Sequence, residues 1–138
     1  MTTAQIALVR DSFSRIAEHA DQIGLAFYDT LFRINPASRA LFPPNIDLQA
    51  RKLMDMLGSI VEGLDDPEGL EKMSRELGRR HVGYGVTDKD YGTVATALLW
   101  TLEQGLGPAF TPPVKQAWTE TYLTLAGVMR DAAAKEAA

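Results

Sequence analysis

Apolar residues recur every three or four positions along almost the whole chain, and glycine and proline interrupt this helical pattern repeatedly. No stretch of the sequence shows the sustained two-residue alternation of a β-strand. Thr2 with Gln5 and Thr87 with Asp90 are spaced as capping boxes, and Pro36 stands at the start of a short helix. These signals predict about seven helices, so the expected fold class is all-α.

The predicted helices end near residues 20, 35, 41, 64, 81 and 105, and the last helix begins after Thr111. An alanine-rich segment follows the last helix at the C-terminus, and we expect this tail to fray from about residue 132. The fourth helix is predicted from Leu48 to Leu64, with Gln49 on its apolar face. A length of 138 residues fits a single domain over 1–138 with one continuous core.

Composition and charge narrow the functional classes. The formal net charge is -4 and the basic residues are scattered, which argues against a nucleic-acid partner or an anionic membrane surface. No apolar run is long enough to span a bilayer and the first residues do not resemble a signal peptide, so we expect a cytoplasmic protein. The sequence contains no cysteine, which excludes disulfides and thiolate ligands.

His81 is the candidate centre of a functional site. Leu70, Met73, Leu77 and His81 are spaced by three, four and four residues, so the imidazole lies on the apolar face of its helix and points inward. A buried histidine of this kind is either a core residue bonded to protein groups or a metal ligand. Because His19 is the only other histidine, a metal centre with nitrogen ligands would have to use His81.

Four residues stand in a characteristic order along the chain. Pro36 opens a short helix and Phe42 follows six residues later. Gln49 then begins a long helical face, and His81 lies 32 residues beyond it. The segments LGRRHVGYGV and LGPAFTPPVKQAW are similar to parts of single-domain bacterial haemoglobins of the Hell's Gate type, of the globin module of flavohaemoglobins and of neuroglobin. The resemblance implies the globin fold, a 3-on-3 helical sandwich with a short C-to-E connection and little or no D helix.

The resemblance also implies a site that holds haem b. His81 would be the iron ligand, and Tyr28 and Gln49 would donate hydrogen bonds to a gas on the opposite, distal side. Gly24 and Ala50 are small enough for two helices to cross closely and bring that pair together. The residues expected around the haem are Phe42, Lys52, Leu53, Met56, Leu77, Arg80, Tyr84, Val86, Tyr91, Val94 and Leu98. Of these, Lys52, Arg80 and Tyr84 are candidates to bind the haem propionates.

The sequence departs from the flavohaemoglobin pattern behind His81. In those relatives a tyrosine and a glutamate form a charged network with the iron-binding histidine. Tyr91 matches the tyrosine, whereas Ala133 stands at the glutamate position. We therefore expect a backbone carbonyl around Leu77 to accept from the His81 ring, and we expect weaker electron donation to the iron.

The implied function is reversible binding of dioxygen, nitric oxide or carbon monoxide at a pentacoordinate-capable iron, as in oxygen transport. Nitric oxide detoxification by dioxygenation, with electrons from a separate reductase, is a further activity that the resemblance suggests. Two alternatives are a gas or redox sensor that acts through a partner protein and a globin-fold interaction protein without haem. The sequence leaves the sixth ligand of ferric iron open: it is water, Tyr28, Lys52 or no group at all.

Overall fold

The computed structural model describes residues 1–83 and 86–137. These ranges contain six α-helices and three short 3-10 helices. No strand occurs within these ranges. In chain order the elements are α1 (Thr3–Ala17), α2 (Ala20–Ile34), η1 (Pro36–Leu41), α3 (Ile46–Glu62), η2 (Gly63–Asp65), α4 (Pro67–Gly83), α5 (Asp88–Leu106), η3 (Gly107–Ala109) and α6 (Pro112–Ala137).

Local capping explains most of the helix starts. The capping boxes predicted at Thr2 and Thr87 are both present, and Pro36 opens η1 as expected. α3 begins two residues earlier than predicted because the Asn45 side chain accepts a hydrogen bond from the Leu48 amide at 3.1 Å. The connection between η1 and α3 is therefore only residues 42–45, two residues shorter than predicted and in agreement with the short connection that the resemblance implied.

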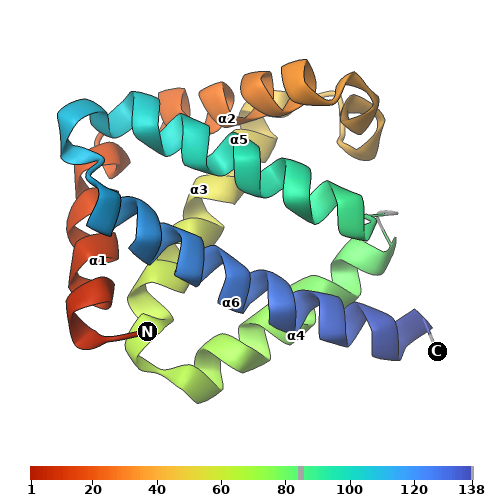
Figure 1. Cartoon of the computed structure of the whole chain (residues 1–138). Helices are drawn as coiled ribbons and strands as arrows, with labels where there is room; N and C mark the ends of the chain where they lie inside the picture. The colour runs from red at the N-terminus through yellow and green to blue at the C-terminus, as the bar shows by residue number, and fades with distance from the viewer. Residues whose placement is uncertain (84–85, 138) are drawn as a thin grey trace.

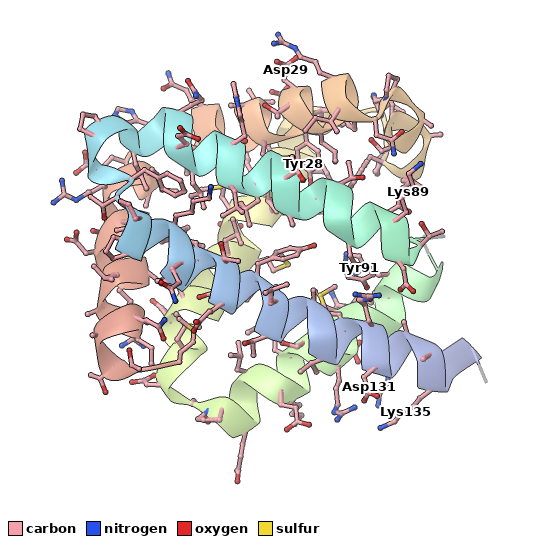
Figure 2. The ribbon with its side chains drawn as sticks, in the orientation of Figure 1. Tyr28, Asp29, Lys89, Tyr91, Asp131 and Lys135 are labelled. Atoms are coloured by element: carbon pink, nitrogen blue, oxygen red, sulfur yellow. The ribbon has the colours of Figure 1, made fainter. Side chains whose placement is uncertain are left out.

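The last helix includes the alanine-rich segment, because α6 continues to Ala137. Fraying of this segment from about residue 132 stays a prediction. Alanine has the highest helix propensity, and Asp131 accepts from Lys135 one turn later at 3.2 Å and from Arg75 of α4 at 3.3 Å. The alanine-rich segment is thus fastened to α4 near the end of α6, where Figure 2 shows Asp131 and Lys135.

The helices form two layers of three. α2, α5 and α6 make one layer, and α1, α3 and α4 make the other (Figure 1). Val9, Leu31, Ile60, Leu102 and Trp118 are almost completely buried between the layers. The Trp118 indole nitrogen donates to the Ser12 hydroxyl at 2.8 Å, so the core pairs its largest polar side-chain group.

Two pairs of helices cross at a glycine. A Cβ atom at Gly24 of α2 would lie 2.8 Å from the Ala50 Cβ of α3, which confirms the predicted close crossing. A Cβ atom at Gly78 of α4 would lie 2.8 Å from the Met129 Cα of α6. Both crossings need glycine because any side chain would push the helices apart. No helix in the described ranges is long and apolar enough to cross a membrane.

Candidate functional site

A cavity of about 870 Å³ lies between the two layers. This volume falls in the range of about 300–1,000 Å³ that is typical of ligand and cofactor sites. Its lining includes twelve of the residues that the sequence predicted: Tyr28, Phe42, Gln49, Lys52, Leu53, Met56, Leu77, Arg80, His81, Val86, Tyr91 and Val94. Leu98 is buried in the core and is not part of this lining, and Tyr84 lies outside the described residues.

His81 is half-buried in the cavity wall near the end of α4. Its Nδ1 donates to the Leu77 carbonyl oxygen at 2.6 Å, which is the backbone acceptor predicted one turn back. Burial lowers the pKa of His81 and the nearby Arg80 charge lowers it further, although the bond to Leu77 partly opposes this shift. The ring is therefore neutral near pH 7, and the bond at Nδ1 leaves the lone pair of the neutral imidazole on Nε2.

The position of α4 is set by its crossing with α6. Met129 packs its backbone directly on Gly78, which lies one residue after Leu77, whose carbonyl accepts from His81, and three residues before His81. α4 makes its most extensive contact with α6, and Arg75 bonds Asp131 across the same interface. We call this side of the cavity, formed by α4 and α6 with His81, the proximal wall.

Tyr28 and Gln49 face the same cavity from α2 and α3, which we call the distal wall. Burial raises the pKa of the Tyr28 hydroxyl, and a hydrogen bond with the Gln49 side chain lowers it in part. Both side chains line the distal wall, and the Gly24–Ala50 crossing brings their helices together. The Tyr28 ring also packs edge-on against Phe42, with ring centroids 5.1 Å apart.

Tyr91 of α5 lines the cavity near α6, as Figure 2 shows, and its hydroxyl is buried without a hydrogen-bond partner among the described residues. Its backbone is held in place, because the Tyr122 hydroxyl donates to the Tyr91 carbonyl at 2.6 Å. Burial raises the pKa of Tyr91. Ala133 offers no side-chain acceptor, so the carboxylate network of the flavohaemoglobin pattern has no counterpart at these two positions.

The two described cations predicted at the cavity differ in their surroundings. Arg80 is paired with Glu76 at 3.5 Å, so its charge is already partly balanced. Lys52 is exposed, lines the cavity and forms no ion pair among the described residues. An exposed ammonium that lines a mostly apolar cavity suits an anionic group of a ligand whose body is apolar.

The lining also contains residues that the sequence did not assign to the site. The apolar ones are Phe27, Leu31, Leu41, Pro43, Met73, Leu125, Ala126 and Met129, and the polar ones include Ser38, Asp55, Ser59, Glu76, Asp90, Thr93 and Tyr122. Leu125 and Met129 belong to the apolar stripe of α6, so the periodic pattern identified them as buried. The periodic pattern could not show whether these two side chains face a cavity or pack against other side chains.

These residues fit a flat, mostly apolar group with a metal at its centre. The cavity offers one neutral imidazole with a fixed tautomer, apolar walls from both layers, and an exposed cation in the lining. Haem has these properties, and Tyr91 presents a buried hydroxyl that a bound ligand or water can satisfy.

Comparisons with known proteins identify relatives of this chain. A family model described as Globin matches residues 25–129. Neuroglobin of Danio rerio is 30% identical in an alignment of 136 residues, including gaps. The alignment covers 88% of this chain and 86% of that protein. A flavohemoprotein of Xylella fastidiosa strain Temecula1 is 32% identical over 129 residues, which cover 91% of this chain and 32% of that protein.

A solved structure has the same arrangement of helices. It is an engineered carbene transferase derived from RmaNOD of Rhodothermus marinus, a protein assigned as a nitric oxide dioxygenase. The two structures superimpose with a TM-score of 0.84 at 29% sequence identity, over 99% of this chain and 94% of the other.

Proposed function

Because the chain belongs to the globin family, we propose that it binds haem b in the cavity and thereby binds dioxygen and other diatomic gases reversibly. The observation that carries this proposal is the His81 ring in the cavity wall, with its Nδ1 bonded to the Leu77 carbonyl at 2.6 Å. The sequence has no cysteine that could attach haem through thioether bonds, which favours haem b.

When bound, haem would supply an iron that takes a diatomic gas. His81 would hold that iron through Nε2, and the carbonyl of Leu77 orients the ring for this role. Tyr28 and Gln49 would donate hydrogen bonds to the gas, and Lys52 would bind a propionate. Phe42, Leu53 and Val94 contribute apolar surface that keeps water away from the iron.

Nitric oxide dioxygenation is the finer activity that we propose. In this reaction nitric oxide, dioxygen and one electron combine to give nitrate, so an electron donor is required. Support comes from the similarity to RmaNOD and to the flavohemoprotein of Xylella fastidiosa. This chain spans only 32% of that flavohemoprotein. We propose that a reductase acts as the electron donor.

Absorption spectra of the ferric, ferrous and oxygenated protein test the cofactor assignment. We expect a Soret band in protein prepared with adequate haem, and a large loss of haem affinity in His81→Ala. His19→Ala is the matched control, because His19 is exposed at the N-terminus of α2. Absence of a Soret band, or full haem affinity in His81→Ala, would show that the proposal is wrong.

The distal pair is tested by the rate of dioxygen release. Tyr28→Phe and Gln49→Leu each remove a hydrogen-bond donor, so each is expected to speed release about two- to tenfold. Unchanged release rates in both variants would exclude Tyr28 and Gln49 as the groups that hold the gas.

A further inference from the structure

Arg39 of η1 binds three consecutive backbone carbonyls in the connection that leads to α3. One guanidinium nitrogen donates to the Phe42 and Pro43 oxygens at 3.3 and 3.2 Å, and another donates to the Pro44 oxygen at 3.3 Å. Prolines 43 and 44 have no N–H, so backbone bonds can do little to fix this segment. The half-buried Arg39 forms no ion pair within residues 1–83 and 86–137, and its donors are directed to the backbone.

The same guanidinium lies over an aromatic cluster. Its central carbon is 5.4 Å from the centre of the Phe32 ring. Phe32 packs against Phe42 at 5.8 Å and against Tyr28 at 5.9 Å, and Phe42 and Tyr28 meet at 5.1 Å. Arg39 therefore restrains Phe42 both through its backbone and through the ring beside it.

The segment that Arg39 holds also leads into the helix that carries Gln49. The Ile46 amide donates to the Pro44 carbonyl at 3.1 Å, and Asn45 caps α3 through the Leu48 amide. The Gln49 amide in turn donates to the Asn45 carbonyl at 3.2 Å. A change in the path of residues 42–45 would therefore move the first turn of α3, and Gln49 with it.

We propose that Arg39 is a positioning residue for the distal wall. By holding the 42–45 connection and the Phe32 ring, it keeps Phe42 packed on Tyr28 and keeps Gln49 within hydrogen-bond distance of the Tyr28 hydroxyl. Lysine cannot replace it, because a single ammonium cannot reach three carbonyls and also lie over the Phe32 ring. The effect on gas binding rests on the proposed function, whereas the restraint on residues 42–49 concerns the protein without haem.

Amide hydrogen exchange in the haem-free protein tests the restraint directly. In Arg39→Gln we expect exchange at Ile46 and Gln49 to be about tenfold faster, the factor that corresponds to the loss of a charge-assisted hydrogen bond. Arg39→Lys keeps the positive charge and should show most of this increase. It also serves as the variant to study if Arg39→Gln does not fold.

Arg33 offers a matched control. It is exposed on α2 and pairs only with Asp29, four residues earlier on the same helix, at 2.9 Å. Arg33→Gln and Arg33→Lys should leave exchange at Ile46 and Gln49 unchanged. Wild-type exchange at these amides in both Arg39 variants would overturn the proposal, and so would an equal increase in the Arg33 variants.

The haem-loaded protein tests the consequence for the distal pair. Dioxygen release from Arg39→Lys should be about two- to tenfold faster than from the wild type, and the carbon monoxide stretching band should shift as hydrogen bonding to the gas weakens. Faster exchange with unchanged release and an unchanged band would overturn the link between Arg39 and the distal pair. If the wild-type chain binds no haem, the proposed function fails, and the exchange data alone decide whether Arg39 restrains the segment.

Discussion

The distal and proximal walls of the cavity are both built on a glycine crossing, but different atoms meet at the two crossings. At Gly24 the nearest neighbours of an added Cβ would be the Ala50 Cβ at 2.8 Å and the Ala50 carbonyl oxygen at 2.9 Å. At Gly78 the nearest neighbours are backbone atoms alone, including the Met129 Cα at 2.8 Å and its carbonyl carbon at 2.9 Å. The distal crossing is thus partly a side-chain contact, and the proximal crossing is a contact between two main chains.

This difference shows where the site can adjust. A side-chain neighbour can be trimmed by mutation, whereas a main-chain neighbour can move only with its helix. The crossing that places His81 therefore cannot be relieved by shortening a neighbouring side chain, whereas the one that places Gln49 can be relieved in part. The walls also differ in polar pairing, because Tyr28 is bonded to Gln49 while the buried Tyr91 hydroxyl has no partner among the described residues.

Gly78→Ala is expected to have the largest effect. The new methyl group would overlap the Met129 backbone, so α4 must move away from α6 at a cost of about 3 kcal/mol in the free energy of unfolding. Urea unfolding of the haem-free protein measures this loss. Gly127→Ala is the control on α6, since a Cβ there meets nothing within 4 Å, and it should stabilise the helix by up to about 1 kcal/mol. Equal stability of the two variants would refute the main-chain contact.

Gly24→Ala should cost less, about 2 kcal/mol, because one of its neighbours is a methyl group. Adding Ala50→Gly removes that methyl group and should restore part of the stability, which a double-mutant cycle of urea unfolding detects as a coupling between the two positions. Strictly additive effects would mean that the Ala50 side chain does not determine the crossing distance.

The two tyrosines should respond in opposite directions to loss of their hydroxyls. Tyr28→Phe removes a hydrogen bond and should destabilise the haem-free protein by about 1 kcal/mol. Tyr91→Phe removes a buried polar group without a partner and should stabilise it by a similar amount, about 1 kcal/mol. Thermal or urea unfolding of both variants checks the signs, and a destabilised Tyr91→Phe would show that the Tyr91 hydroxyl is bonded after all.

The smallest expected effect concerns the ion pairs at the end of the proximal wall. The hydrogen bond from Lys135, and then the one from Arg75, hold the pKa of Asp131 below its ordinary value of about 3.9. Their contribution to stability is therefore present above that value and is lost as the pH falls through the lower pKa of the folded protein. Asp131→Asn should lower the urea midpoint slightly at pH 7, and the difference from the wild type should shrink between pH 5 and pH 3.

Asp29→Asn is the control for this last prediction, because Asp29 pairs only within α2 and does not join two helices. A difference between Asp131→Asn and the wild type that stays constant from pH 7 to pH 3 would exclude the charge of Asp131 as its cause.

Features that depend on a few neighbouring residues could be predicted from the sequence. The capping boxes at Thr2 and Thr87 lie within one helical turn, so spacing alone identified them. The bond from His81 to Leu77 also lies within one turn, and it was expected once the resemblance showed Ala133 at the glutamate position. The Gly24–Ala50 crossing could also be predicted, since small residues beside Tyr28 and Gln49 leave room for two helices to approach. Asn45 was missed as a cap because two prolines just before it obscured the start of α3.

The sequence by itself determined the all-helical class, most helix boundaries, and the residues that face inward, because these follow from short-range hydrogen bonds and the helical period. Only the tertiary structure decided which inward residues meet a cavity: Met73 and Met129 line it, whereas Leu98 packs into the core. It also decided that the helices of the proximal wall cross at Gly78 and that Arg39 donates to backbone carbonyls before α3. Most of these outcomes depend on where helices distant in sequence cross, and side-chain periodicity contains no information about that crossing point.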